Sequence, residues 1–588
     1  MQPSQQRNRD RLEAESGGEA FDQPSADPED LDGAGEAGEG AAEDRALGPA
    51  RSVFAVGDGK QSIYRFQRAD PQQFADMQGY FAGRVRDAER KWDPVDLIHS
   101  FRSSAAVLRL VDLGRPHRLV FDETYYAKDA LSLLRFNDAR SFVDGADEMI
   151  LAGDLDVFTD DPSFVVHPPG GKWLIAGGIR LLGMEPAGWR LASALAGVIT
   201  VMIVARAGRR LFRSTLLGSL AGLLLAVDGM SITVSRVAIL DGILAMFVAA
   251  AFACLLVDRD RARHRYAEWA LSLPSSLGRV SHGPALSWRP WRLAAAVMLG
   301  MACATKWSGL FVVAVFGLLT VLWDVSARRA MGVRAPWTGA VFKDGPTAFL
   351  TVVPVAVVTY LATWWGWIAG SDGWSRQWAQ DNPASGPAAA LPGWLRSLWH
   401  YHGEMLSFHR GLDASHDYES SAWGWLLMVR PVSFDYMGLE EGEQGCEAER
   451  CSQAMLALGT PVLWWGGALA LLVCLWMWVF KRDWRPGAVL AGVVATWAPW
   501  LFFLDRTTFS FYAAAIAPFL VLAVAYVLGL VLGPPGATPT RRTVGAAVAG
   551  AYVLCTVAPS ARSRLTSSIR LYMLSVCDSG ECSESSAR

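Results

Sequence analysis

The chain carries repeated apolar runs between residues 189 and 559, and these runs limit its fold more strongly than any other feature. Each is close to the length at which a helix spans the hydrocarbon core of a bilayer, roughly 20 residues. Lipid offers the backbone no hydrogen-bonding partner, so such runs must be helical. The sequence therefore predicts an all-α polytopic membrane protein with about ten transmembrane helices. The expected spans are 189–206, 214–232, 237–257, 292–306, 307–324, 348–370, 460–480, 487–504, 509–532 and 543–559.

Basic residues fall in every second loop between these runs. They cluster in segments 206–213, 259–265, 328–334, 481–485 and 541–542. Loops rich in Lys and Arg stay in the cytoplasm, so these loops are expected on the inner side. The remaining connections then share the outer side, together with the segment before Trp189. They are 233–236, the turn at Lys306, 371–459 and 505–508.

Composition divides the rest of the chain. Residues 1–51 are rich in Gly, Ala, Ser, Glu and Asp, which predicts an acidic, disordered, low-complexity segment. Residues 52–115 have the mixed composition of a small soluble α/β unit. The further expected parts are an external loop with membrane-proximal helices at 116–188, transmembrane helices at 189–370, an external loop at 371–459, transmembrane helices at 460–560 and a tail at 561–588.

Two external segments carry candidate catalytic groups. Asp122 and Glu123 are adjacent carboxylates, and a carboxylate within reach of an acceptor hydroxyl can act as a general base. The same pair also suits the start of a helix, where the macrodipole favours acidic side chains. His167 is followed by two prolines and then by Lys172, a pattern that suits either anion binding at a helix start or an ordinary proline-initiated helix.

Charged residues at the membrane boundary form a second group of candidates. Arg190 begins the first apolar run, Lys306 lies between two runs, and Arg236 and Asp241 lie at an external turn. Ionisable groups at such positions are costly unless paired or functional. Lys306 is a candidate for neutralising a lipid-linked phosphate, and Arg190 is a candidate functional residue by its position alone. The alternatives are a lipid-headgroup contact for Arg190 and a structural ion pair between Arg236 and Asp241.

The loop at 371–459 is rich in aromatic residues. Tyr418, Glu419, Trp423 and Arg430 make it a candidate for binding a sugar or an acceptor peptide. Its histidines His402, His409 and His416 are seven residues apart, which does not match a metal-binding pattern. The sequence therefore predicts no metal site and no bound cofactor. Cys446 and Cys451 share this loop, and Cys577 and Cys582 share the tail; either pair could close a short disulfide.

These segments together resemble the protein O-mannosyltransferase family in its actinobacterial form. The resemblance rests on FDETYYAKDA at 121–130, HPPGGKWL at 167–174, GWR at 188–190, 228–241, VDRDR at 257–261, KWSGL at 306–310, 418–431 and RTTFSFY at 506–512. It covers about residues 116–560 and keeps the family's order and spacing. No single one of these motifs is as specific as the set.

The resemblance implies a GT-C glycosyltransferase fold and an inverting transfer of mannose from polyprenyl-phosphate-mannose to Ser or Thr of a protein. It implies a plasma-membrane enzyme with an external active site, one that needs no metal or other cofactor. The secretion channel is an expected partner. Asp122 matches the family's base, and Glu123 would place the acceptor or the donor. Arg190 would contact the donor phosphate or stabilise the loop, and His167, Lys172 and Lys306 would bind the donor.

A second resemblance concerns residues 52–112. VGDGKQSIYRF at 56–66 and SFRSS at 100–104 are similar to the middle of a superfamily 1 DNA helicase. The chain has no GxxxxGK[ST] phosphate loop, so we expect neither ATP hydrolysis nor a nucleic-acid partner. The mannosyltransferase family has a membrane helix before its acidic loop, whereas this stretch has none. We therefore hypothesise a chimera with its junction near 112–118.

Three other functions remain as alternatives. A related GT-C enzyme would move another lipid-linked sugar onto lipid or glycan, and only the motif match separates it from a protein mannosyltransferase. An inactive chimera is a second alternative. A transporter would need ionisable residues at the bilayer midplane and repeated halves, which the sequence does not offer.

Overall fold

The computed structural model describes residues 101–274, 280–440, 442, 446, 450–534, 536–565 and 576–577. The expectations for residues 1–51, for 52–100 and for most of the tail fall outside these residues. So does Cys582, and with it the second disulfide pair.

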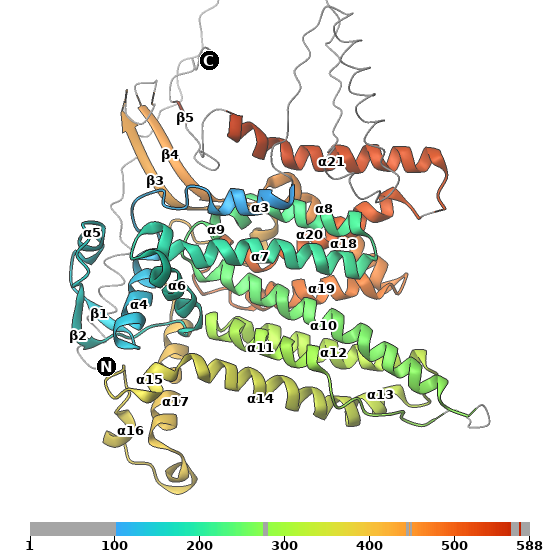
Figure 1. The fold of residues 1–588 in the computed structure, drawn as a ribbon, viewed down its shortest axis with the longest axis horizontal. Coiled ribbons are helices and arrows are strands. Elements are labelled where there is room, and N and C mark those ends of the chain that lie inside the picture. The colour runs from blue at the N-terminus through green and yellow to red at the C-terminus, as the bar shows by residue number, and fades with distance from the viewer. Residues whose placement is uncertain are drawn as a thin grey trace, which may run out of the picture. The chain divides into compact units, whose positions relative to one another are not determined.

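Every expected membrane span contains a helix. The long helices run roughly parallel to one another in one bundle (Figure 1). They are α7 (Pro186–Phe212), α8 (Thr215–Ala226), α9 (Gly229–Ser235), α10 (Leu240–Leu271), α11 (Pro290–Thr305), α12 (Gly309–Ala330), α14 (Gly345–Thr363), α18 (Pro461–Val479), α19 (Trp484–Thr496), α20 (Ala517–Leu532) and α21 (Pro539–Leu565). The polytopic all-α prediction is confirmed.

The helices differ in how fully they meet the length of a bilayer. Among the described residues, five helical stretches are long and apolar enough to cross a membrane. A sixth span is broken: α8 and α9 meet at an angle of 61°. Helices α11, α19 and α20 are shorter, at 16, 13 and 16 residues. Each expected span is therefore helical, but the helices in some of the spans are shorter than the spans predicted from the sequence.

One end of the bundle carries the non-membrane elements. The segment after α3 (Phe101–Leu110) forms α4 (Glu123–Phe136), β1 (Arg140–Phe142), α5 (Ala146–Leu151), β2 (Phe158–Pro162) and α6 (Gly170–Leu182). Strands β1 and β2 pair antiparallel. The long loop after α14 adds α15 (Trp365–Ala369), α16 (Trp378–Asp381), α17 (Gly393–Arg410), β3 (Val432–Glu440) and β4 (Arg450–Ala457). Both groups lie at the left of Figure 1.

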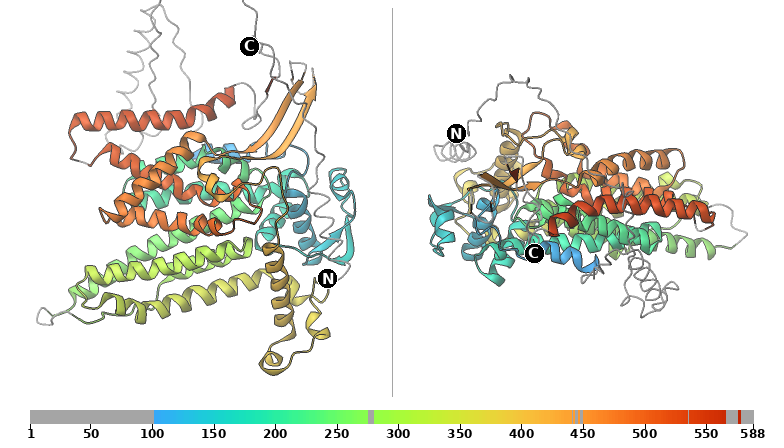
Figure 2. Two further views of the ribbon diagram at one scale, coloured as in Figure 1. Left: turned by 180° about the vertical axis from the view of Figure 1, so that it is seen from behind. Right: turned by 90° about the horizontal axis from the view of Figure 1, so that it is seen from above.

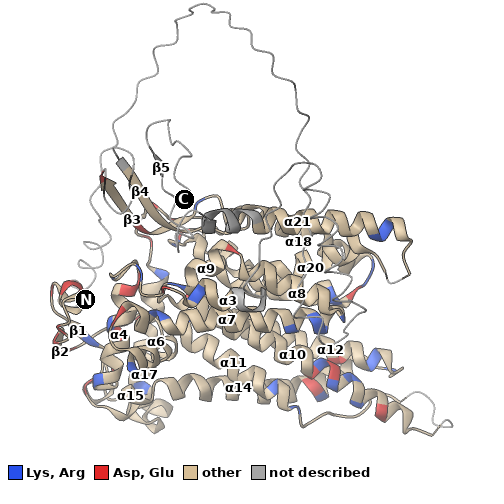
Figure 3. Ribbon diagram, turned by 45° about the horizontal axis from the view of Figure 1, so that its top comes forward, with Lys and Arg blue, Asp and Glu red and all other residues tan. Residues whose placement is uncertain are grey.

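The opposite end of the bundle carries the basic loops (Figure 3). Arg210 at the end of α7 pairs with Asp260 on α10 at 2.8 Å, and the Arg259 guanidinium lies 3.2 Å from the ring centroid of Trp484, at the start of α19. The basic clusters after the first, third and seventh expected spans thus meet at one end, as the charge pattern predicts. α10 continues as helix through residues 258–271, which the sequence had placed in a loop.

Helix α3 belongs to the membrane bundle. Arg109 is fully buried and donates hydrogen bonds to the carbonyl oxygens of Leu225 and Ala226, which the end of α8 leaves free, and to Ser231. In return, Arg236 donates to the carbonyl oxygens of Leu108, Val111 and Asp112 at the end of α3. Residues 101–112 therefore pack with the membrane helices, so the compact membrane unit begins before the expected boundary at residue 115, and the junction near 112–118 stays a prediction.

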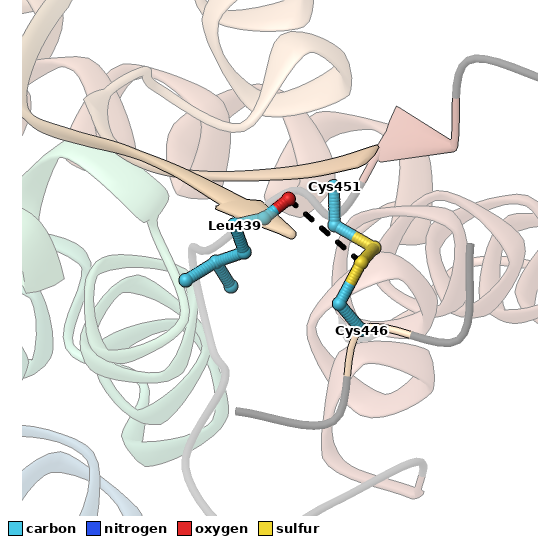
Figure 4. The surroundings of a disulfide bond; sticks show 3 residues. All are labelled: Leu439, Cys446 and Cys451. Atoms are coloured by element: carbon cyan, nitrogen blue, oxygen red, sulfur yellow. Dashed lines mark hydrogen bonds between the residues drawn. A yellow bond between two sulfur atoms is a disulfide. The ribbon is translucent and has the colours of Figure 1, made fainter. Parts of the chain in front are cut away.

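A disulfide-closed hairpin extends from the loop at 371–459. Strands β3 and β4 pair antiparallel, and β4 also pairs with β5 (Val576–Cys577). Cys446 and Cys451 form a disulfide at the far end of the hairpin, and the Cys446 sulfur contacts the Leu439 carbonyl (Figure 4). The first of the two proposed disulfides is confirmed. The periodicity of the loop gave no indication of these strands.

Replacing Arg109 with Ala should destabilise the whole membrane unit. The change leaves the last carbonyl groups of α8 buried without their donor, a loss of about 3 kcal/mol for a hydrogen-bonded buried charge. Thermal unfolding of the full chain in detergent measures the effect. Arg115→Ala is the matched control, because that side chain is 71% exposed and should change stability by less than about 0.5 kcal/mol. Equal stability of the two variants would contradict the anchoring of α3.

Candidate active site

A cavity of about 520 Å³ opens at the end of the bundle that carries the loops. Segments far apart in the sequence form its wall: the turn at His167, the start of α10, the turn between α11 and α12, the end of α17 and residues 500–515. The lining includes His167, Asp241, Lys306, Trp307, His409, Arg410, Asp413, Trp500, Asp505, Arg506 and Tyr512. His167, Lys306 and the 505–506 turn, which the sequence assigns to the same side of the membrane, all line this cavity.

The segment at the start of α4 that carries Asp122 and Glu123 is called the acidic loop below, and it lies beside this cavity. Phe121 adopts a left-handed backbone conformation with φ of 50°, which a bulky residue takes only when its surroundings impose it. Its ring packs against Phe434 on β3 at 4.9 Å and against Phe511 at 5.5 Å. The hairpin also contacts this loop through an ion pair of Arg118 and Asp435 at 2.6 Å. The loop that carries Asp122 is therefore held from two sides.

Glu123 is a buried anchor for this loop. Its side chain is fully buried, and its two carboxylate oxygens accept hydrogen bonds from Nε and Nη2 of Arg190, both at 2.8 Å. The same oxygens also accept from the backbone amides of Ala238 at 2.8 Å and Val120 at 3.1 Å. A carboxylate with four such donors has no lone pair to spare for a substrate. Glu123 fixes the acidic loop to α7 and to the turn before α10.

Arg190 has the matching structural role. Its five N–H groups are engaged by Glu123 and by the carbonyl oxygens of Leu113, Pro116 and Arg118. A guanidinium has only five donors, so none is left for a phosphate. The expectation that Arg190 binds the donor phosphate is therefore wrong, and its alternative, stabilisation of the loop, is confirmed.

Asp122 differs from Glu123 in its burial and in its hydrogen-bonding partners, both of which matter for proton transfer. It is half-buried and lies next to Tyr126, whose hydroxyl hydrogen-bonds to it. Burial raises the pKa of Asp122 to about 6; the nearby Lys306 opposes this shift and the Asp241 carboxylate adds to it. Among the described residues no cation lies within ion-pair distance of Asp122. Asp122 is thus a carboxylate poised to exchange a proton near neutral pH.

Lys306 and Asp241 form a buried ion pair at the cavity wall. The Lys306 ammonium lies 2.7 Å from an Asp241 oxygen and 4.5 Å from the ring centroid of Tyr512. Arg236 contacts the end of α3 instead, so the alternative of an Arg236–Asp241 pair is wrong. An ammonium has three donors, and Asp241 accepts one, so Lys306 keeps donor capacity toward the cavity.

His167 reaches the cavity because α6 begins unusually close to α11. A side chain at Gly170 would meet the Ala304 carbonyl at 2.8 Å, and one at Gly171 would meet Leu240 at 2.7 Å. The His167 ring stacks on His409 at 5.2 Å, and burial and nearby cations keep the pKa of His167 well below its ordinary value. His167 is therefore a neutral ring at the cavity wall.

Lys172 does not reach the cavity. Its ammonium pairs with Asp129 on α4 at 2.7 Å, and both side chains are buried. This pair ties α6 to α4, the two helices that flank the acidic loop. The expectation that Lys172 binds the donor phosphate does not fit this geometry, because its ammonium is buried against Asp129.

The four loop residues also lie outside the cavity lining. Tyr418 and Glu419 belong to a turn that Ser420 ties to Thr508 by two backbone contacts, and the ring of His416 in the same turn packs on Phe509 at 5.1 Å. Trp423 and Arg430 are exposed. Trp425 is the buried aromatic residue of this loop, with its ring 5.9 Å from that of Tyr512. The substrate-binding role of these four residues stays a prediction.

Sequence reasoning missed several residues of the cavity. Arg410 ends α17 and is exposed at the cavity, and Arg506 donates to the carbonyl oxygen and the Nδ1 of His409. Burial lowers the pKa of His409 to about 4, so this ring is neutral and accepts from Arg506. The 505–506 turn was assigned to the external face, which was the available signal. Nothing in the local sequence indicated that α17 turns its last residues toward the site.

Residues that could hold a metal do not gather in the part of the chain that the structure describes. No three His, Cys, Asp or Glu side chains there are arranged to bind an ion. His402, His409 and His416 instead contact Tyr360, Val166 and Phe509 separately. The absence of a cofactor stays a prediction.

The chain is similar to known mannosyltransferases along most of its length. Residues 100–367 match the family described as dolichyl-phosphate-mannose-protein mannosyltransferase, and residues 394–560 match the C-terminal four-helix membrane region of protein O-mannosyltransferases. The polyprenol-phosphate-mannose–protein mannosyltransferase of Mycolicibacterium smegmatis (strain MKD8) is 41% identical over 460 residues, 76% of this chain and 84% of the relative. That of Mycobacterium tuberculosis (strain CDC 1551 / Oshkosh) is 39% identical over 479 residues, 80% of this chain and 87% of the relative.

A solved structure shares the fold. The Saccharomyces cerevisiae protein O-mannosyltransferase Pmt1-Pmt2 complex bound to the sugar donor matches with a TM-score of 0.55 and 15% identity. The match covers 78% of this chain and 88% of that chain.

Replacing Glu123 with Gln should loosen the acidic loop and destabilise the chain. The change leaves the Arg190 charge buried without its counter-ion, which costs about 3 kcal/mol or more. Thermal unfolding of the full chain and limited proteolysis after residue 112 measure both effects. Glu148→Gln, at an exposed position of α5, is the control and should be neutral. The double variant Glu123→Gln, Arg190→Met should lose less stability than the sum of the single variants, and strict additivity would contradict the pairing.

Proposed function

The chain belongs to the dolichyl-phosphate-mannose-protein mannosyltransferase family and transfers mannose from a polyprenyl-phosphate carrier to protein, and from this premise we propose which residues do so and where. The chain is a multi-pass membrane protein. The acceptors are Ser and Thr hydroxyls, and the reaction takes place on the external face of the plasma membrane. The basic clusters at the end of the bundle opposite the cavity support this orientation.

Asp122 is the base in this proposal. The observation that carries it is the contrast between two adjacent carboxylates: four donors occupy Glu123, whereas Asp122 is half-buried, forms no ion pair among the described residues and has a pKa raised to about 6. A base whose pKa lies near the working pH is deprotonated and still accepts a proton effectively. Glu123, Arg190 and Lys172 act indirectly, because they fix the segments that carry Asp122 and His167.

The reaction is a single displacement. Asp122 accepts the proton of the acceptor hydroxyl as its oxygen attacks C1 of mannose, and the bond between C1 and the phosphate oxygen breaks. The polyprenyl phosphate leaves with the bonding electron pair, and the configuration at C1 inverts. The proton then passes from Asp122 to water. The leaving phosphate gains negative charge, so cations near it lower the barrier.

Lys306, Arg506 and Arg410 are the cations available to that phosphate. All three line the cavity, and Lys306 also lies close enough to Asp122 to influence its pKa. His167 and His409 are neutral, so they suit contacts with sugar hydroxyl groups better than contacts with phosphate. No cofactor enters the proposal, because Asp122 accepts the acceptor proton and the three cations balance the charge of the leaving phosphate.

The rim of the cavity suits a lipid-borne donor. Five of its lining residues are large, apolar and exposed, which is unusual for a surface in contact with water. They come from the start of α12, from α17 and from the turn before Arg506, and are Leu310, Leu406, Phe502, Phe503 and Leu504. A polyprenyl chain that lies in the bilayer can pass this rim while its sugar phosphate enters the cavity. Cooperation with the secretion channel stays a prediction, since no contact described here bears on it.

Replacing Asp122 with Asn should abolish transfer without unfolding the chain. The amide keeps the shape of the side chain but cannot take the acceptor proton, and loss of a general base costs roughly 100-fold or more in rate. The rate of mannose transfer from polyprenyl-phosphate-mannose to a Ser/Thr-rich peptide measures the effect. Asp160→Asn, at an exposed position of β2, is the matched control and should keep full activity. Transfer by Asp122→Asn at the normal rate would remove Asp122 from the mechanism.

Transfer should fall as the pH drops through about 6. The folded chain holds the Asp122 pKa above its ordinary value, so the carboxylate is the active base above about pH 6 and is protonated below it. A plot of kcat/KM against pH should therefore lose one power of ten per pH unit on the acidic side. The same burial disfavours the charged form, so Asp122→Asn should not lower the unfolding temperature at pH 7. An acidic limb centred near pH 4 would contradict the raised pKa.

A further inference from the structure

Helix α17 presents large apolar side chains to its surroundings. Trp399 is 81% exposed and Leu406 is 48% exposed, and Leu395 lies one turn before Trp399 on the same face. The side chains of Leu398, Tyr401 and Met405 point the other way and are buried against α14 and α15. The helix is therefore apolar on two faces, of which only one has a protein partner among the described residues.

The exposed apolar face has a polar neighbour. Ser407 lies beside it on the helix surface and is exposed. On the same side of α17, Arg396 donates to the carbonyl oxygens of Ala379 and Asn382, and His400 stacks on Trp378 of α16 with ring centroids 4.3 Å apart. The exposed apolar face thus borders polar side chains on one side, which is the pattern of a helix that lies at a lipid–water boundary. An aromatic residue such as Trp399 is typical of that boundary.

The direction of α17 fits the same setting. Figures 1 and 2 show that α17 runs across the direction of α14 rather than along it, at the end of the bundle that carries the cavity. The lipid-facing side of α14 exposes Phe349, Leu350, Val357 and Val358, and α15 continues it with Trp365. A cluster of Trp364, Trp367, Leu398, Tyr401 and Met405 holds α17 against the end of this surface. The buried face of α17 therefore packs at the end of a surface that already meets lipid, and its exposed apolar face lies at the same end of the bundle.

We propose that α17 lies in the plane of the membrane, with Trp399 and Leu406 inserted into the lipid leaflet on the side of the cavity. The partner is the lipid surface itself, and the argument for it is continuity with the apolar outer surface of α14. An apolar helix face of this kind gains free energy in proportion to the area it removes from water.

The same helix forms part of the site. Leu406 and His409 line the cavity, and Arg410 follows them at the end of α17. His402 accepts or donates a hydrogen bond with the Tyr360 hydroxyl at 2.7 Å and stacks on Trp307 at 5.6 Å. Because α17 is one continuous helix, its position on the lipid surface also determines the positions of these side chains. Lipid contact at Trp399 thus positions the cavity wall, and neither this role nor the lipid contact depends on which residue is the base.

Spin labels on the full chain in lipid nanodiscs test the lipid contact. Nitroxides are placed singly at positions 399 and 406 and, as a matched control on the polar side, at the exposed position 407, after Cys254, Cys303, Cys474, Cys555, Cys577 and Cys582 are replaced by Ala. At 399 and 406 we expect collision with dissolved oxygen to exceed collision with a water-soluble nickel chelate several-fold, and the reverse at 407. Equal nickel access at 406 and 407 would overturn the proposal. So would shielding of 399 and 406 from both reagents, which would indicate a protein partner or a second copy of the chain.

Transfer by variants of Trp399 tests the link to the site. Trp399→Gln should lower kcat/KM for polyprenyl-phosphate-mannose several-fold in nanodiscs, whereas Trp399→Phe should stay near the parent value. Trp288→Gln, an equally exposed tryptophan just before α11, is the control and should have no effect. The side chain at 399 is too exposed to support the fold, so unfolding is not expected. Normal transfer by Trp399→Gln would overturn the positioning role, and failure of Asp122→Asn to lose activity would leave this result untouched.

Discussion

The buried pair of Glu123 and Arg190 is the interaction on which the active site depends. It joins the acidic loop to α7. Its hydrogen bonds to Leu113, Pro116, Arg118 and Val120 hold the stretch that leads to Asp122, and the bond from Ala238 adds the turn before α10. Every donor of the guanidinium and both oxygens of the carboxylate are used. A buried charge pair is stabilising only under such complete pairing. The position of the Asp122 backbone depends on this pair, because the adjacent residue Glu123 is held in place by it.

The cavity combines groups of opposite charge without neutralising them all. Asp241 holds Lys306 in place, yet the ammonium retains donors for a substrate. His167 and His409 stay neutral because burial and the surrounding cations disfavour their charged forms. The same burial raises the pKa of Asp122. The cavity thus offers cations and neutral rings, and Asp122, whose pKa Lys306 and Asp241 influence, lies beside it.

The sequence predicts the bundle well because lipid imposes one solution on long apolar runs. It also predicts which end carries the site, because Lys and Arg mark the opposite end. It does not predict which of two adjacent carboxylates is free. Asp122 and Glu123 look alike in the chain, and only the position of Arg190, 67 residues later, distinguishes them. Lys172 and Arg190 were assigned to phosphate for the same reason: their partners, Asp129 and Glu123, become visible only once the helices are packed.

The position of α3 bears on how the two resemblances meet along the chain. Arg109 and Arg236 bond α3 to α8, α9 and the turn before α10 in both directions, so its ten residues are part of the transferase core. The family match begins at residue 100, at the same place as the compact unit that holds the membrane helices. Residues 100–104, which resemble a helicase segment, therefore overlap the first residues of the transferase unit. The chimera hypothesis stays a prediction, and the structure adds one constraint to it: a junction near 112–118 would fall inside a single packed unit, because Arg109 already bonds to the end of α8.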